Sequence, residues 1–533
     1  MKSLLTIIVF IFSTTLSAEN VTLNTPQGDL IGKLAPTNDA VRIFLGIPYA
    51  APPIASARWK PPATPERWTG ERMATDYGPN CMQEPYPKGS FFYRPVRLSS
   101  EDCLYLNVWT SAHSDEKRPV MVWIHGGALT RGSGARATYD GSNLVQKGIV
   151  LVTINYRLGV FGYFAHPELI SESPNDAAGN YGLLDQVKAL EWVQNNIAAF
   201  GGDPDNVTIF GQSGGGCKVP VLMAMEAAKG LFHKAIMQSS SAHLQLATLE
   251  DTERVTGYVL KELGVTKTEE LQQIPTDTIF NAYLTAVRTN SGNDCFRPTI
   301  DGHTIKNNPF DLNAPDLAAD VPLLIGTAET EKSFYDIIRK PEDLPLTEEQ
   351  LIAKSAAFVG IDTKIARKLI AGYRQGREAE SHRDIYNRIT SDQMYRRNSI
   401  EAAERKINQG AAPAFLYEFT YRVPALGGVL RSPHTMCLPF IFGTTKIAEA
   451  FTGAGPEQDA LTDAVQGAWS AFAHTGNPNH AGLADWEPYN VVTRPTMVFD
   501  KKCRQEMDPK PEDRKRIMAC PPFVTDKMLP IPA

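Results

Sequence analysis

A glycine-rich turn between an apolar strand and an apolar helix constrains the fold of this chain more than any other feature. Val207–Phe210 has the composition of a buried strand, and Val219–Met225 has that of a helix. The turn between them, residues 211–216, reads GQSGGG. Strand, turn and helix pass close together there, so the positions beside Ser213 must lack bulky side chains. We therefore predict a strand–turn–helix unit that holds the Ser213 hydroxyl outward.

Further apolar segments predict a parallel sheet with helices on both faces, which is an α/β fold. Three other runs have the composition of buried strands, at Val120–Ile124, Ile149–Ile154 and Val321–Gly326. Between the second of these runs and the serine turn, Leu183–Phe200 carries apolar side chains at helical spacing. A strand, a helix and a strand in succession form a right-handed crossover between parallel strands.

Composition favours one large domain. The chain has 533 residues, of which 43% are hydrophobic and 21% charged, without an internal repeat or a low-complexity linker. We expect a single large α/β domain over residues 19–533, with insertions near 245–315 and 337–412, where charge and helical pattern increase. The formal net charge of −6 lacks the concentrated positive charge that nucleic-acid binding needs, so no nucleic-acid partner is expected.

The N-terminus predicts export. Lys2 precedes the short apolar run Leu4–Phe12, and small residues follow up to Ala18, as in a signal peptide over residues 1–18. No second uninterrupted apolar stretch of about 20 residues follows, so we expect a secreted or periplasmic chain without a stable membrane anchor.

Seven cysteines then stand in an oxidising compartment, where pairs close in sequence are candidates for disulfides. These pairs are Cys81 with Cys103 and Cys503 with Cys520. Because the count is odd, at least one thiol is left without a partner within the chain. No CxxC pair is present, and we expect no metal site.

The serine turn has the G-x-S-x-G sequence of a nucleophile elbow, which makes Ser213 the candidate nucleophile. The backbone N–H of Gly214 lies at a helix N-terminus, where developing negative charge is favoured. A second loop, HGGA at residues 125–128, follows the strand that ends at Ile124. The N–H groups of such a loop form the other half of an oxyanion hole. The two elements together predict acyl transfer to Ser213.

A nucleophilic serine requires a histidine base and a carboxylate that orients the histidine. In this type of fold they follow the serine in the order acid, then base. His434 stands in a loop before the apolar segment Leu438–Phe442, and it is the candidate base. Glu329 and Glu331 both follow the strand that ends at Gly326, where open α/β sheets carry their sites. The residues alone leave the choice between these two glutamates open.

Several motifs resemble those of the type-B carboxylesterase and cholinesterase family of α/β-hydrolases, over about residues 20 to 500. The segments that carry the resemblance are Phe44–Ala50, Glu101–Val108, Asn155–Arg157, Phe200–Pro204, Pro298–Gly302 and Thr475–Asn479. The resemblance implies an α/β-hydrolase fold, with a mostly parallel central sheet and helical insertions around an active-site gorge. It also implies hydrolysis of small-molecule carboxylic esters through an acyl-enzyme, with no metal or organic cofactor.

The resemblance assigns roles to individual residues. It selects Ser213 as nucleophile, Glu331 rather than Glu329 as acid, and His434 as base. The residues that it implies for the oxyanion hole are Gly127, Ala128 and Gly214, with Gly126, Gln212 and Ser239 in supporting positions. It further implies the disulfide between Cys81 and Cys103 and a structural ion pair between Arg58 and Glu101.

The chain departs from the family pattern at several positions. Gln212 stands where the family usually has glutamate, and Cys437 stands where it usually has an acidic residue. The loop over residues 91–94 lacks the tryptophan that grips choline, which argues against a dedicated cholinesterase. Loops near the expected pocket mouth carry arginines that would meet an anionic substrate, namely Arg94, Arg97 and Arg131.

Two alternatives use the same resemblance. An acyltransferase would use the same triad with an alcohol in place of water. A non-catalytic recognition protein of the family would have lost triad residues, whereas all three positions are filled here.

Overall fold

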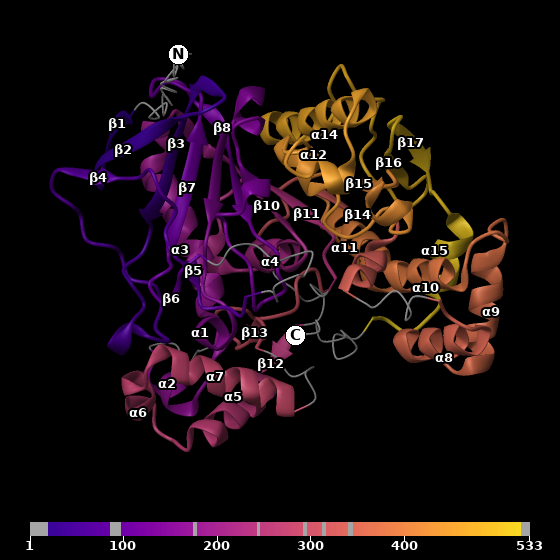
Figure 1. The fold of residues 1–533 in the computed structure, drawn as a ribbon, viewed down its shortest axis with the longest axis horizontal. Coiled ribbons are helices and arrows are strands. Elements are labelled where there is room, and N and C mark those ends of the chain that lie inside the picture. Colours follow the sequence, from indigo (N-terminus) through magenta and orange to yellow (C-terminus); the bar gives the residue numbers. More distant parts are fainter. Residues whose placement is uncertain are drawn as a thin grey trace, which may run out of the picture.

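A long sheet crosses the molecule and carries helices on both faces (Figure 1). This computed structural model describes residues 20–85, 97–173, 179–241, 246–290, 296–311, 316–338 and 345–523. The predicted signal peptide at 1–18 lies outside the described residues. Within these ranges, no helix is both long and apolar enough to cross a membrane.

The described part of the sheet has thirteen strands in the order β1-β2-β3-β7-β9-β8-β10-β11-β14-β15-β16-β17, with β4 paired to β2. From β9 to β16 the neighbours run parallel. Antiparallel strands extend both ends. The bounds are β1 (Asn20–Thr25), β2 (Gly28–Ala35), β3 (Asn38–Pro48), β4 (Glu71–Met73), β7 (Tyr105–Thr110), β8 (Arg118–Ile124), β9 (Val150–Ile154), β10 (Gly202–Gln212), β11 (Lys234–Gln238), β14 (Leu323–Ala328), β15 (Ala414–Phe419), β16 (Pro495–Phe499) and β17 (Arg504–Met507).

Both faces of the central strands are buried, as their apolar composition predicts. In β8, Val120 and Val122 belong to one hydrophobic cluster and Met121 and Trp123 to another, because successive side chains point to opposite faces. The first cluster includes side chains of α3 (Tyr181–Asn196), α4 (Gly214–Met223) and α11 (Arg397–Asn408). The second includes side chains of α12 (Leu438–Phe442) and α14 (Pro456–Thr475). The fold is therefore the predicted α/β type.

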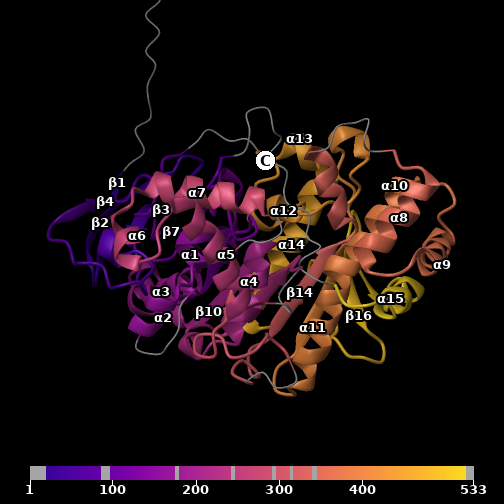
Figure 2. The same ribbon diagram turned by 90° about the horizontal axis from the view of Figure 1, so that it is seen from below.

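The regions predicted to be insertions are mainly helical. The first holds α5 (Leu249–Leu263), α6 (Thr268–Gln273) and α7 (Thr276–Thr289). The second holds α8 (Glu348–Val359), α9 (Thr363–Arg374), α10 (His382–Ser391) and α11. Figures 1 and 2 show α5–α7 and α8–α10 toward opposite ends of the molecule, with α8–α10 near α15 (Pro511–Met518).

One predicted disulfide forms and the other does not. Cys81 and Cys103 are bonded across a sequence separation of 22. The predicted bond between Cys503 and Cys520 is wrong, since both thiols are free. Cys503 packs against the hydrophobic cluster that includes α12 and α14, whereas Cys520 packs against side chains of α8, α9 and α10. Sequence proximity did not predict the pairing, because α15 lies between the two cysteines and places Cys520 in a different hydrophobic cluster.

The predicted ion pair is confirmed. Arg58 and Glu101 lie 2.6 Å apart, and both side chains are almost fully buried. Arg58 also donates to the carbonyl oxygens of Leu271 and Ile274, which fastens the end of α6 to the body of the domain. Its role in the structure is therefore to hold chain segments together.

Candidate active site

Ser213 lies on a strained turn between β10 and α4. Its φ of 60° and ψ of −128° place a non-glycine residue in a sparsely populated region, as at a nucleophile elbow. The turn has no room for side chains beside it. A Cβ at Gly214 would lie 2.1 Å from the carbonyl oxygen of Ala128, and one at Gly216 would lie 2.4 Å from that of Gln238. The crowded backbone thus explains why glycines surround this serine.

The HGGA loop that follows β8 packs directly against the elbow. Gly127 and Ala128 have φ values of 114° and 56°, which turn the loop back toward α4. A Cβ at Gly126 would lie 2.6 Å from the carbonyl oxygen of Gln212. Gly214 begins α4, so its N–H has no acceptor within the helix. The loop and the helix start therefore form one contiguous backbone surface beside Ser213.

Glu331 and His434 meet although 103 residues separate them. Glu331 Oε2 lies 2.5 Å from His434 Nδ1, and both side chains are buried, with 0% and 2% exposure. The other carboxylate oxygen, Oε1, accepts from the N–H of Ala328 at 2.7 Å. A carboxylate at Nδ1 holds the ring proton there and leaves Nε2 as an acceptor. This tautomer is the one that takes a proton from a serine hydroxyl.

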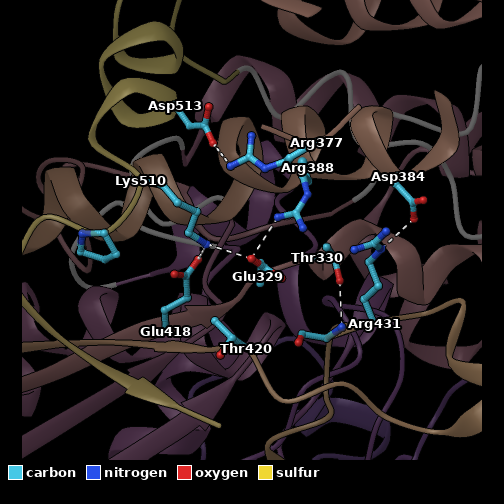
Figure 3. Close-up of polar contacts among 12 residues, drawn as sticks. Glu329, Thr330, Arg377, Asp384, Arg388, Glu418, Thr420, Arg431, Lys510 and Asp513 are labelled. Carbon is cyan, nitrogen blue, oxygen red and sulfur yellow. Dashed lines mark hydrogen bonds and ion pairs between the residues drawn. The ribbon is translucent and has the colours of Figure 1, made fainter. Parts of the chain in front are cut away.

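Glu329, the other glutamate of the same loop, faces away from His434. Its carboxylate binds Arg388 at 3.0 Å and Lys510 at 3.2 Å (Figure 3). Burial alone would raise the pKa of Glu329, but Lys510 and Arg388 hold it well below its usual range. The contacts therefore separate the two glutamates that the residues alone left open, and only Glu331 contacts the histidine.

The same group of charges fastens the loop of His434 to α10. Arg388 binds Glu380 at 2.8 Å, and Glu380 in turn binds Arg431 at 3.0 Å. Arg431, which precedes His434 in the same loop, also binds Asp384 at 2.8 Å (Figure 3). The loops that carry Glu331 and His434 are thus both tied to one helix. We call Glu329, Glu380, Asp384, Arg388, Arg431, Glu418 and Lys510 the rear charge cluster.

The side-chain amide of Gln212 lies close to both ring nitrogens of His434. The Gln212 Nε2 lies 3.1 Å from His434 Nε2 and 3.3 Å from Nδ1. Within the described part of the chain, the hydroxyl of Ser213 makes no hydrogen bond to His434. A nitrogen nearly equidistant from both ring nitrogens lies over the face of the imidazole and not along the in-plane lone pair of Nε2. The Gln212 amide therefore packs against the ring, and the contact that sets the tautomer is the one between Glu331 and Nδ1.

Three aromatic rings surround His434, and the sequence analysis did not find them. Their centroids lie 5.6 Å (Phe334), 6.4 Å (Tyr335) and 5.1 Å (Tyr395) from that of the imidazole. The hydroxyls of Tyr335 and Tyr395 are 3.0 Å apart. Phe334 and Tyr335 follow Glu331 closely in sequence, so their position near the candidate acid could have been inferred from the sequence. Tyr395 belongs to a π-helical turn, Asp392–Arg396, that no sequence signal marks.

Ser239 lies where the resemblance places a supporting serine, at the end of β11. It is buried, has a φ of 49°, and donates its N–H to the carbonyl oxygen of Gly326. Among the described residues, however, its hydroxyl is hydrogen-bonded to neither Glu331 nor His434. Its supporting role stays a prediction.

The arginines near the expected pocket mouth have protein partners. Arg131 binds Glu84 at 2.7 Å, and Arg97 stands 4.6 Å over the ring of Tyr77. Arg94 lies outside the described residues. A contact between these three arginines and an anionic substrate stays a prediction. Over the ranges described, no group of three or more His, Cys, Asp or Glu side chains is placed to hold a metal ion.

Comparison with known proteins extends these local observations to the whole chain. A model of the carboxylesterase family matches residues 19–516. The para-nitrobenzyl esterase of Bacillus subtilis (strain 168) is 36% identical over 493 residues, which cover 90% of this chain and 96% of that protein. Carboxylesterase 1D of Rattus norvegicus is 36% identical over 511 residues, covering 88% of this chain and 87% of its own. A solved carboxylesterase structure from Geobacillus stearothermophilus has a TM-score of 0.80 at 34% identity, covering 93% of this chain and 99% of that one.

Proposed function

This chain belongs to the carboxylesterase family of α/β-hydrolases and is a carboxylic-ester hydrolase, and from that premise we propose that it is a secreted serine esterase that works through an acyl-enzyme. Its substrate is a small-molecule ester. The observation that carries the mechanism is the buried contact of 2.5 Å between Glu331 and His434, in a molecule whose Ser213 stands on a strained elbow.

In the first half-reaction, Ser213 Oγ attacks the ester carbonyl carbon while His434 Nε2 takes the hydroxyl proton. Glu331 stabilises the imidazolium that forms. The N–H groups of Gly127, Ala128 and Gly214 receive the negative charge of the tetrahedral oxygen.

The first half-reaction ends when the tetrahedral intermediate collapses and the alkoxide leaves with the proton from His434 Nε2. In the second half-reaction, water attacks the acyl-serine and Nε2 accepts one of its protons. The second tetrahedral intermediate releases the carboxylic acid and restores the Ser213 hydroxyl. The ring collar of Phe334, Tyr335 and Tyr395 supports this chemistry, because it excludes bulk solvent from the imidazole.

Export is supported by two separate features. The N-terminal pattern over residues 1–18 is that of a signal peptide. The Cys81–Cys103 disulfide persists in oxidising compartments and is rare in a reducing cytosol.

The test is hydrolysis of p-nitrophenyl esters from acetate to laurate by the wild type and by Ser213→Ala. We expect the variant to lose at least roughly 10⁴-fold in kcat, and a fluorophosphonate probe to label only the wild type. The chain length that gives the highest rate then measures the acyl pocket. Full activity in Ser213→Ala would refute the mechanism. Ester products formed with added alcohol would identify acyl transfer instead of hydrolysis.

A further inference from the structure

A fully buried lysine lies under the candidate oxyanion hole, and the mechanism above does not use it. Lys218 belongs to α4 and has 0% exposure. Its Nζ donates to the carbonyl oxygen of Gly214 at 2.9 Å and to that of Ala128 at 3.3 Å. These two residues belong to the two different backbone segments that supply oxyanion donors. The ammonium group therefore bridges the HGGA loop and the start of α4.

The position of Lys218 is unfavourable for a cation in the resting protein. In the part of the chain that the structure describes, no carboxylate lies within ion-pair distance of Nζ. The side chain also bends back toward the N-terminal end of α4, where the helix dipole is positive. Burial lowers the pKa of Lys218 to about 7, and the nearby Cys217 only partly opposes that effect. A buried charge without a counter-charge is costly, and such groups concentrate at functional sites.

The described groups that contact Lys218 are polar or aromatic, and none of them is a carboxylate. Nζ stands 4.9 Å over the ring of Tyr156, whose hydroxyl donates to the carbonyl oxygen of His125 at 2.5 Å. The imidazole of His125 stacks on that ring. Burial lowers the pKa of His125 to about 3, the Gly126 carbonyl opposes this, and Lys218 and Arg136 lower it further. His125 is therefore neutral, and the protonated form of Lys218 is the charge that this layer presents to the oxyanion loop.

We propose that Lys218 is a positioning residue of the oxyanion hole. Its ammonium group ties Ala128 to Gly214 and so holds the N–H groups of both segments at the spacing that one oxygen requires. It also places positive charge behind these donors. The anion that forms on the substrate oxygen is the counter-charge that Lys218 lacks at rest, so the interaction strengthens in the transition state. This inference rests on the proposed function.

The test compares Lys218→Met with the wild type, with active sites counted by fluorophosphonate labelling. We expect kcat to fall by about 10- to 100-fold, short of the loss from removing a whole donor, with KM nearly unchanged. A trifluoromethyl ketone forms a hemiketal oxyanion with Ser213, so its affinity should fall by a similar factor. The Tm is recorded alongside, because the substitution removes an unpaired buried charge but also the hydrogen bonds to the carbonyls of Ala128 and Gly214.

Lys406 supplies the matched control. It is also fully buried, and its Nζ donates to a backbone carbonyl, that of Ala319 at 2.7 Å, but it lies on α11 outside the site. Lys406→Met should leave kcat per active site and the affinity for the trifluoromethyl ketone unchanged. The two variants thus separate burial of a lysine from its place under the oxyanion loop.

Two outcomes would overturn the proposal. One is a kcat for Lys218→Met within twofold of the wild type. The other is a parallel loss for Lys218→Met and Lys406→Met. If Lys218→Met does not fold, Lys218→Gln replaces it, and a wild-type kcat in that neutral variant would equally overturn the proposal. Ser213→Ala, run in the same assay, reports on the proposed function separately, because it removes the nucleophile and leaves Lys218 in place.

Discussion

The charges behind Glu331 and the charge beneath the oxyanion loop are built in opposite ways. In the rear charge cluster, Glu329 binds two cations, and Lys510 also binds Glu418 at 2.7 Å. Beneath the oxyanion loop, the partners of Lys218 among the described residues are carbonyl oxygens and an aromatic face. Both regions are mostly buried and both adjoin the candidate site.

The difference teaches how buried charge can serve a site in two ways. A network in which each charge has a partner offsets its desolvation at rest, so it fixes the geometry of the loops that carry Glu331 and His434. A charge without a partner is unfavourable at rest and gains its partner only when negative charge develops. The first arrangement positions groups, and the second is suited to stabilising a transition state.

The largest expected effect comes from the glutamate that contacts the histidine. Glu331→Gln should lower kcat by roughly 10³- to 10⁴-fold at neutral pH, because an amide neither holds the required tautomer nor stabilises the imidazolium. Initial rates on p-nitrophenyl butyrate measure this loss. Glu329→Gln is the matched control, and it should lower kcat by less than about 10-fold. Equal losses in the two variants would contradict the division of roles between these neighbours.

The next effect is on stability. Glu329→Gln removes a carboxylate shared by Arg388 and Lys510, so the free energy of unfolding should fall by about 2 to 4 kcal/mol. Arg388 keeps Glu380 and Lys510 keeps Glu418, which limits the loss. Urea unfolding at pH 7, followed by tryptophan fluorescence, measures it. An unchanged midpoint would show that the rear charge cluster does not stabilise the fold.

The same variant predicts a pH dependence with a definite sign. The pKa of Glu329 is lowered in the folded protein, so its contribution to stability is present above the unfolded-state pKa and is lost as pH falls. The stability advantage of the wild type over Glu329→Gln should therefore begin to decrease below about pH 5, and it should keep decreasing as the pH falls toward the lowered pKa of the folded state. Tm values recorded from pH 7 to pH 3 test this. Parallel curves over that range would contradict it.

The smallest expected effect comes from adding a second negative charge beside His434. Gln212→Glu places a carboxylate beside the imidazole of His434, where Gln212 Nε2 now lies at 3.1 Å from Nε2. Because an anion favours the imidazolium, the acid limb of kcat/KM should move to higher pH by about 1 unit. Gln212→Met is the neutral control and should not produce that shift. An acid limb that stays in place in Gln212→Glu would refute the interpretation.

Features set by neighbours in sequence were predictable. The glycines around Ser213 and in the HGGA loop indicate tight turns, because a Cβ at these positions would clash with the backbone of a neighbouring segment. The buried strands were visible because both faces of a central parallel strand are apolar. The helix after Ser213 begins at Gly214, earlier than its apolar run at Val219 suggested, because glycines enter the first turn without an apolar signal.

Features set by distant contacts required the tertiary structure. Glu329 and Glu331 are alike in sequence, and what separates them is that one reaches Arg388 and Lys510 and the other reaches His434. The cysteines near the C-terminus pack in different clusters, which their spacing did not reveal.

The sequence by itself determined the nucleophile turn, the loop beside it and the class of fold, since each depends on local sterics and on the period of apolar residues. Only the tertiary structure decided which carboxylate meets the base, which rings surround it, and that Lys218 is buried against Gly214 and Ala128 without a carboxylate. The physical reason is that the energy of a buried charge depends on its neighbours in space, and folding brings those neighbours from segments far apart in the chain.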